Sequence, residues 1–191
     1  PIVSAVWRPN GGNSNKIPNE DSTELVFDET NLFSVNRFTG FDRIEGGPRL
    51  NYGLKWGVLG EEGSSTNFFV GQSYRIRTDS TFAAGSGLED NFSDIVAQVK
   101  ISPGSHLDLL YRTRFSSDNF SPNRNEVAFA AGIPAFRLGG NYVFLDQQDD
   151  SEFEGREELS MTATSKINRF WSTGFNAVRN ISDDAMRTAG F

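Results

Sequence analysis

Apolar and polar residues alternate along most of this chain from Leu50 onward. Between Leu50 and Val58, Leu, Tyr, Trp and Val residues occupy every second position, with Asn, Gly and Lys residues between them. A period of two places successive side chains on opposite faces of a β-strand. The same alternation recurs near residues 67–78, 95–102, 107–115, 127–133, 136–144, 158–167 and 171–180. With short β-rich runs at 1–8 and 187–191, it predicts about ten strands and no helix.

The connections between these predicted strands alternate between short and long. The short ones lie near residues 60–66, 103–104, 134 and 168–169. The long, polar ones are residues 9–43, 79–92, 117–124, 146–155 and 182–185. In an up-and-down sheet this alternation gathers the short turns at one rim and the long loops at the other, as in outer-membrane barrels. A sandwich joined by Greek-key crossings does not require it.

Strand length also separates membrane sheets from soluble ones. The predicted strands have about 9–12 residues, whereas strands of globular proteins most often have about 5–6, and a tilted membrane-spanning strand needs about 9–11. Full charges such as Lys100 and Arg112 stand within the polar faces, where a barrel has a wet lumen. We therefore predict an all-β fold, an antiparallel up-and-down transmembrane β-barrel segment with about ten strands of a larger barrel. A soluble β-sandwich has the same periodicity and stays an alternative.

Composition excludes several other classes of function. The formal net charge of -7 and the pI of about 4.8 argue against binding to a nucleic-acid backbone, so no nucleic-acid partner is expected. The chain has no Cys and a single His, His106, which argues against a thiolate or zinc site. No apolar run reaches the roughly 18 residues of a membrane helix. We predict no catalytic residue, no bound metal and no cofactor.

Six cations on the polar faces of the predicted strands form the first set of candidate functional residues. Arginine and lysine suit contact with phosphate groups, so these cations could guide a phosphorylated lipid headgroup. Alternatively they solvate a lumen, pair with carboxylates such as Asp108 and Glu158, or contact a plug protein. The six are Arg75, Arg77, Lys100, Arg112, Arg114 and Arg137.

The long segment from Ile17 to Tyr52 forms the second set. It is rich in Asn, Asp, Ser and Gly, which favour turns, yet it also carries several Leu and Phe residues that a solvated linker would not need. A long loop with apolar anchors is usually packed and functional. We expect it to fold against a barrel interior or a plug, with an external loop packed on its neighbours as the alternative. The candidate partner contacts are Leu32, Phe33, Phe38, Phe41, Asp42 and Arg43.

A family resemblance rests on this same segment. The runs DETNLFS at 28–34 and NRFTGFDR at 36–43 resemble the LPS-assembly outer-membrane protein family, LptD, also called OstA or Imp. The similarity lies in the order of a Pro-bounded strand, a loop with a Gly-aromatic-Asp-Arg end and an aromatic-rich strand. It covers nearly all of these residues, but only a later part of the family's C-terminal transmembrane barrel.

The resemblance implies a function and a set of partners. Members translocate lipopolysaccharide (LPS) and insert it into the outer leaflet of the outer membrane of a Gram-negative bacterium, and they are not enzymes. The implied partners are an LptE-like lipoprotein plug, LPS, outer-membrane lipid and the periplasmic LPS-transport bridge, which an N-terminal domain contacts.

We expect residues 1–191 to be one partial outer-membrane β-barrel domain, a fragment without the periplasmic domain, the terminal strands and the lateral gate between them. Two alternatives stay open at this stage: a porin-like outer-membrane channel for anionic solutes, and a soluble β-sandwich binding module.

Overall fold

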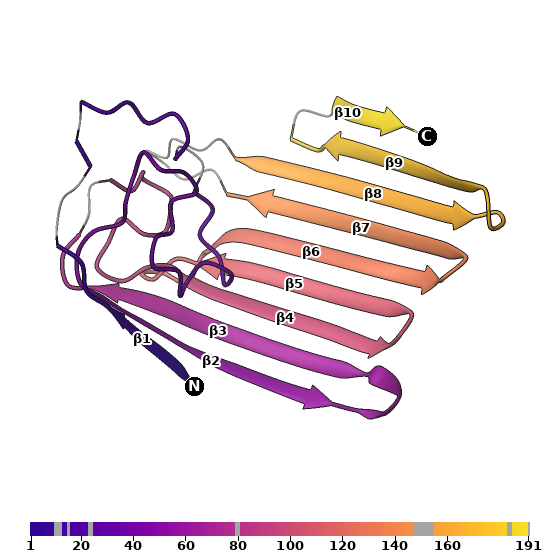
Figure 1. Ribbon diagram of the computed structural model, residues 1–191, viewed down its shortest axis with the longest axis horizontal. Helices are drawn as coiled ribbons and strands as arrows, with labels where there is room; N and C mark the ends of the chain where they lie inside the picture. The colour runs from indigo at the N-terminus through magenta and orange to yellow at the C-terminus, as the bar shows by residue number, and fades with distance from the viewer. Residues whose placement is uncertain are drawn as a thin grey trace.

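A computed structural model describes residues 1–9, 13–14, 16–22, 25–78, 81–146, 155–182 and 185–190. These residues form a single antiparallel sheet whose ten strands follow one another in sequence order (Figure 1). One turn of 3₁₀-helix, η1 (Glu61–Gly63), joins β2 to β3. The strands are β1 (Ile2–Val6), β2 (Arg49–Leu59), β3 (Ser65–Arg75), β4 (Ile95–Gly104), β5 (Leu107–Phe115), β6 (Pro122–Ile133), β7 (Phe136–Leu145), β8 (Arg156–Lys166), β9 (Ser172–Asn180) and β10 (Ala185–Gly190).

The order of the strands confirms the predicted up-and-down topology. Every strand pairs antiparallel with the next, and β1 and β10 form the two edges of the sheet. Tight turns join β2 to β3, β4 to β5, β6 to β7 and β8 to β9 at one end, and the long connections gather at the opposite end (Figure 1). We call these ends the short-turn rim and the long-loop rim. Within the described residues no helix is long and apolar enough to cross a membrane.

Strand register confirms that the apolar residues share one face. Directly opposed residues run across six strands from Trp56 through Phe68, Val99, Tyr111 and Val127 to Tyr142. This apolar face is open to its surroundings, and the side chain of Trp56 is 57% exposed. Broad exposure of large apolar side chains is unusual on a soluble monomer and is normal for a face in contact with lipid. The sheet therefore has the polarity of a membrane barrel segment.

Polar residues occupy the opposite face in matching rows. Gln98 of β4 opposes Arg112 of β5, and Arg112 opposes Glu126 of β6. Buried residues gather on this face, among them Asn51, Ser73 and Glu126. Burial on the polar side is the reverse of a soluble sheet, in which the apolar face forms the core. The described strands lie in one sheet and not in two packed sheets, so the sandwich alternative is wrong for them.

Two strand boundaries differ most from the sequence prediction. Strand β3 ends at Arg75 and not at Thr78: the amide of Ile76 still bonds to the carbonyl of Pro48, but Pro48 has no amide hydrogen with which to continue the pairing. Strand β6 begins at Pro122, well before the predicted start at Val127. Its first residues, Asn123 to Glu126, are polar on both faces and hide the alternation on which the prediction relied.

Polar residues on the apolar face find partners on that same face. Asn125 accepts a hydrogen bond from the hydroxyl of Tyr111 at 2.7 Å, across the β5–β6 pair. Gln72 accepts one from Tyr52 at 2.6 Å and donates to the carbonyl of Ser93. A side-chain amide is costly to bury unless it is hydrogen-bonded. These tyrosines allow two amides to interrupt the apolar face near the long-loop rim.

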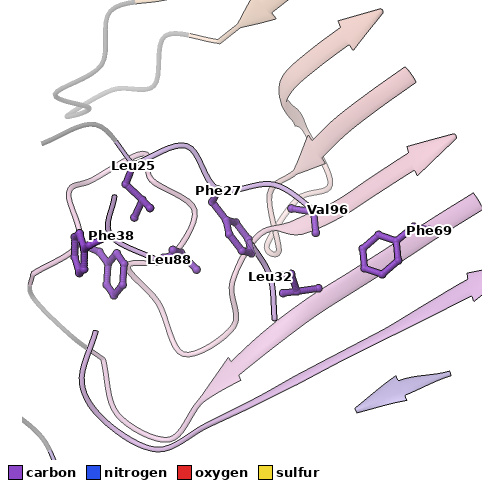
Figure 2. Packing of buried hydrophobic residues seen from close by; sticks show 8 residues of the cluster. Leu25, Phe27, Leu32, Phe38, Phe69, Leu88 and Val96 are labelled. Carbon is purple, nitrogen blue, oxygen red and sulfur yellow. The ribbon is translucent and has the colours of Figure 1, made fainter. Parts of the chain in front are cut away.

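The apolar core lies between the polar face and two loops that cover it. We call residues 25–48 the docked loop and residues 81–94 the rim loop. Phe38 of the docked loop stacks on Phe82 of the rim loop, with ring centroids 4.9 Å apart. Figure 2 shows how side chains of both loops meet side chains of β3 and β4. The cluster consists of Leu25, Phe27, Leu32, Phe38, Phe69, Phe82, Leu88 and Val96.

The two faces predict opposite outcomes for adjacent substitutions in β5. Leu109 lies on the apolar face between Ile101 and Phe129, whereas Asp108 lies on the polar face. An Arg facing the lipid midplane costs about 2–4 kcal/mol, so Leu109→Arg should reduce assembly into membranes far more than Asp108→Arg. The measurement is the yield of folded protein, seen as heat-modifiable mobility on gels. Equal yields for the two variants would contradict the assignment of the faces.

Candidate functional site: a loop docked on the polar face

Side-chain-to-backbone hydrogen bonds fold the docked loop locally. Asp28 accepts from the amide of Thr30 at 2.9 Å, and Asn31 accepts from the amide of Asp28 at 3.1 Å. Asn31 also donates to the carbonyl of Val26 at 2.7 Å. Asp and Asn form such turns because their short side chains reach nearby backbone groups. The turn at 28–31 places Leu32 and Phe33 at its exit, where they face the sheet.

A second turn connects this loop to the segment before it. The carboxylate of Asp21 accepts hydrogen bonds from the amides of Phe41 and Asp42, at 2.9 and 3.0 Å. Asp42 in return accepts from the amides of Glu20 and Asp21. These backbone donors hold the pKa of Asp21 below its usual value. A side chain at Gly40 would collide with Asp21, which explains why a glycine precedes Phe41 in the motif.

Four buried charges join the docked loop to the sheet. One oxygen of Glu45, Oε1, lies 2.8 Å from Arg75 of β3, 3.3 Å from Arg37 of the loop and 3.4 Å from Arg49 of β2. The side chain of Glu45 is 0% exposed. Three guanidinium groups share this carboxylate. Burial lowers the pKa of Arg37 to about 10, opposed by Glu45, and the group keeps its charge at neutral pH.

Hydrogen bonds to neutral groups add to the environment of Arg37 and Arg49. Arg37 donates through Nη2 to the carbonyl of Leu32, to Asn51 of β2 at 2.8 Å and to Ser73 of β3 at 2.9 Å. Arg49 donates through Nη2 to the carbonyls of Ser34 and Val35, at 2.9 and 2.7 Å. Buried charges need such partners in place of water. The loop backbone therefore wraps around guanidinium groups of the sheet and of the loop itself.

The loop approaches the sheet most closely at Gly71 of β3. A Cβ atom at this position would collide with the side chain of Leu32. Phe33 packs edge-on against Phe69, with ring centroids 6.3 Å apart. Gly71 and Phe69 both belong to the polar face. The polar face thus holds an apolar patch in β3 that receives the anchors of the loop.

Two further ion pairs fasten loops to β4, β5 and β6. Glu29 of the docked loop accepts from Nε of Arg112 at 2.7 Å and from Gln98 at 2.7 Å. Asp94 of the rim loop lies 3.1 Å from Nε of Arg114, and its pKa is raised chiefly by burial. Arg114 also donates to the carbonyls of Gly85 and Ser86 of the rim loop, each at 2.9 Å.

The six predicted cations therefore divide into two groups. Arg75, Arg112 and Arg114 are buried or half-buried and paired with acidic residues of the docked loop or the rim loop. Arg77, Lys100 and Arg137 are exposed. The sequence suggested Asp108 and Glu158 as partners of the six cations, but neither pairs with any of them. Asp108 accepts a hydrogen bond from Ser102, and Glu158 pairs with Arg156.

The structure separates the predicted loop residues as well. Leu32 and Phe38 are buried and Phe33 is half-buried, all three in contact with the core cluster or its neighbours. Phe41 does not pack against the sheet, because its side chain is 96% exposed, and its expected contact with a plug stays a prediction. The bonds from Asp21 to the backbone of Phe41 and Asp42 fix this turn and direct the ring outward. Arg43 donates to the carbonyl of Ile17 at 3.2 Å and joins two parts of the long segment.

Sequence reasoning missed the residues that connect the loop to the sheet: Arg37, Glu45, Arg49, Glu29 and Asp94. One signal could have pointed to them. The polar faces of β2 to β5 contain more Arg than acidic residues, so acidic partners had to come from elsewhere, either from a loop or from the next strand, as Glu126 of β6 does for Arg112. Which acidic residue reaches which Arg depends on the path of the loop, and the periodicity of the strands does not encode that path.

An acidic hollow of about 400 Å³ opens at the long-loop rim, between the rim loop and the turn at 116–121. Glu89, Asp90, Asp118 and Asp146 contribute to its lining. Across the part of the chain that the structure describes, however, no three His, Cys, Asp or Glu side chains are grouped closely enough to hold a metal ion. The docked loop, which buried ion pairs hold against the sheet, is therefore the stronger candidate for a functional site.

Comparison with known proteins links this fold to LPS transport. The family described as LptD, LPS transport system D, matches residues 1–171. The LPS-assembly protein LptD of Legionella pneumophila (strain Paris) is 40% identical over 62 residues, which make up 31% of this chain and 7% of the relative. The LPS-assembly protein LptD of Pseudomonas putida (strain GB-1) is 33% identical over 103 residues, 53% of this chain and 10% of the relative. The matched segments therefore span a tenth or less of these relatives.

Replacing Glu45 should release the docked loop. Glu45→Gln leaves three buried guanidinium groups without their carboxylate, and breaking a buried pair costs about 3–5 kcal/mol. We expect amide hydrogen exchange in residues 25–48 to accelerate strongly, while strands β5 to β9 keep their protection. The matched control is Glu158→Gln, whose partner Arg156 is 46% exposed, and such a pair is worth about 0–1 kcal/mol. Equal exchange of residues 25–48 in both variants would contradict the role of Glu45.

Proposed function

The chain belongs to the LptD family of LPS transport proteins, and on this basis we propose that it forms part of the outer-membrane barrel that inserts LPS into the outer leaflet. Residues 1–191 would contribute one stretch of the wall of a single β-barrel domain. The edges β1 and β10 would each pair with a further strand, because a lipid-exposed strand edge is too costly. The shared face of the apolar side chains, which runs across β2 to β7, supports this placement.

The family match carries the proposal, and the docked loop is the structural feature that supports it. If the polar face lines the lumen, residues 25–48 lie inside the barrel near the long-loop rim. A loop held there by buried ion pairs would narrow the lumen. Because the chain belongs to the LptD family, we favour LPS insertion over the porin-like channel.

We further propose that the exposed side of the docked loop contacts a lipoprotein plug of the LptE type. Phe41 is held outward by a fixed turn, and Val35 and Ile44 are about half exposed on the same loop. Burying a side chain of this size contributes about 1.5–3 kcal/mol, and aromatic residues are frequent anchors of interfaces. Asp42 and Arg43 follow Phe41 in the sequence and would form the polar rim of this contact.

The exposed cations Arg77, Lys100 and Arg137 are the proposed contacts for the phosphates of LPS. Because Arg75, Arg112 and Arg114 pair with loop carboxylates, their part in this function is to hold the loops. The periplasmic LPS-transport bridge would meet the protein through a separate N-terminal domain. No catalytic step is proposed.

Photocrosslinking tests the partner contact. A photoreactive amino acid replaces Phe41 in one variant and Phe33 in another, in cells that depend on the protein. We expect position 41 to crosslink to a separate lipoprotein, because its side chain faces outward, and position 33 to crosslink within the protein, because it faces β3. Efficient labelling of a cysteine at position 41 on intact cells, with no crosslink to any lipoprotein, would argue against the contact.

LPS delivery itself is measured in cells by depletion and complementation. Glu45→Gln, which is expected to free the docked loop, should reduce the appearance of newly made LPS at the cell surface and should admit small anionic antibiotics. A porin-like function predicts that loss of the loop increases conductance and leaves LPS delivery unchanged. That second result would favour the channel over the transport proposal.

A further inference from the structure

The polar face of the sheet is divided into two unlike halves. Near the long-loop rim, the arginines of β2, β3 and β5 are buried or half-buried under the docked loop and the rim loop and pair with carboxylates, as Arg75 and Arg114 do. Near the short-turn rim the same face is bare. Its cations there are exposed: Lys55 in β2, Lys100 in β4, Arg137 in β7 and Lys166 in β8.

The bare half carries an excess of positive charge. In the described ranges neither Arg137 nor Lys166 has a carboxylate within ion-pair distance, in contrast to the arginines under the loops. Asp108, the acidic residue of β5 on this half of the face, accepts a hydrogen bond from Ser102 at 2.6 Å. This positive field lies on a protein whose formal net charge is -7. This half of the face is therefore locally positive, although the chain as a whole is negative.

Two of these cations meet at one hollow. A pocket of about 410 Å³ lies where the β6–β7 turn meets the end of β8 and the start of β9. Arg137 opposes Thr164 across the β7–β8 pair, and Lys166 opposes Ser172 across the β8–β9 pair. Arg137 and Lys166 are thus diagonal neighbours on one face, a spacing of about 7–8 Å between Cα atoms. The lining residues are Pro134, Ala135, Arg137, Thr164, Ser165, Lys166 and Ser172.

The backbone holds this hollow in a fixed shape. The amide of Lys166 donates to the carbonyl of Ala135 at 2.8 Å, which extends the β7–β8 ladder into the β6–β7 turn. Gly132, just before that turn, has a φ of 137° and would place a Cβ atom against the backbone of Phe136. The turn that forms one wall of the pocket therefore requires glycine at this position.

We propose that this pocket binds a phosphate monoester. Arg137 provides a planar guanidinium that can hold two phosphate oxygens, and Lys166 provides a second positive charge. The hydroxyls of Thr164 and Ser172 lie beside them as further donors. A phosphate monoester carries about 1.5–2 negative charges at pH 7, which two cations match. The volume falls within the about 300–1,000 Å³ of small-ligand sites, so an attached sugar also fits.

The phosphate could belong to a lipid headgroup or to a free sugar phosphate or phosphate ion. The lipid source rests on the proposed function, because a phosphorylated lipid has to enter the barrel to reach the pocket. The phosphate site itself does not rest on it. Arg137 and Lys166 stand at the short-turn rim, away from the docked loop, so the site and the loop can be tested separately.

Calorimetric titration of the purified protein in detergent micelles tests the site. The probe is inorganic phosphate at low ionic strength, and the site variant is Arg137→Gln with Lys166→Gln. The control is Lys55→Gln, which removes a cation from the same half of the face, outside both the pocket and the proposed LPS contacts. We expect the site variant to weaken phosphate binding about tenfold or more and the control to weaken it less than about twofold. Folding of each variant is checked by heat-modifiable mobility.

If phosphate binding weakens equally in the site variant and the control, the proposed site is wrong, because the phosphate then responds to the overall positive charge of the face and not to a defined pocket. Unchanged binding in the site variant would overturn it as well. A second titration compares a glycolipid with a phosphate monoester on its sugar and the same glycolipid after phosphatase treatment. We expect the phosphorylated glycolipid to bind more tightly than the dephosphorylated one. If the site variant abolishes this difference in affinity, the lipid source is supported. Equal glycolipid binding by wild type and site variant, with phosphate binding lost, would overturn the lipid source and the proposed LPS contact at Arg137. It would leave the phosphate site and the place of the chain in the LPS-transport barrel standing.

Discussion

The shared ion pair of Glu45 with Arg37, Arg49 and Arg75 is the interaction on which the rest of the structure depends. A single carboxylate cannot neutralise three buried guanidinium groups, and desolvation alone would make this arrangement costly. Backbone carbonyls of the docked loop provide the additional acceptors, at Leu32, Ser34 and Val35. The loop therefore folds around these arginines, and its path places backbone carbonyls where their guanidinium groups can donate hydrogen bonds.

This arrangement explains why the core of the protein lies on the polar side of the sheet. A membrane sheet presents its apolar side chains to lipid, so they cannot form a core with each other. The loops bring their own Leu and Phe residues to the other face, where Phe69 and Val96 receive them (Figure 2). Gly71 permits the close contact with Leu32. Ion pairs at Glu29 and Asp94 then fix the margins of the covered area and leave the short-turn half of the face bare.

Much of the fold could be predicted from the sequence because a strand with one apolar face has a period of two. The strands, their order and their faces were predicted in this way. The predicted bounds were least accurate at the end of β3 and at the start of β6, whose first residues are polar on both faces. The site was predicted less completely. Leu32 and Phe38 are buried, whereas Phe41 is exposed, and residue type alone does not distinguish Phe41 from the other two. Its outward position follows from the bonds between Asp21 and the turn, and the pairing of Glu45 with three arginines likewise follows from a folded path that no periodicity encodes.

The most direct test of this account is a crosslink between the docked loop and the polar face. The chain has no Cys, so a pair of engineered cysteines joined by a short bifunctional reagent can be assigned without ambiguity within it. Phe33→Cys is combined with Phe69→Cys on the polar face, whose ring packs edge-on against that of Phe33, or with Val70→Cys, the neighbour of Phe69 on the apolar face. The account predicts a crosslink for positions 33 and 69 in the membrane-embedded protein and none for positions 33 and 70. Crosslinking of neither pair, or of both pairs equally, would contradict the docking of the loop on the polar face.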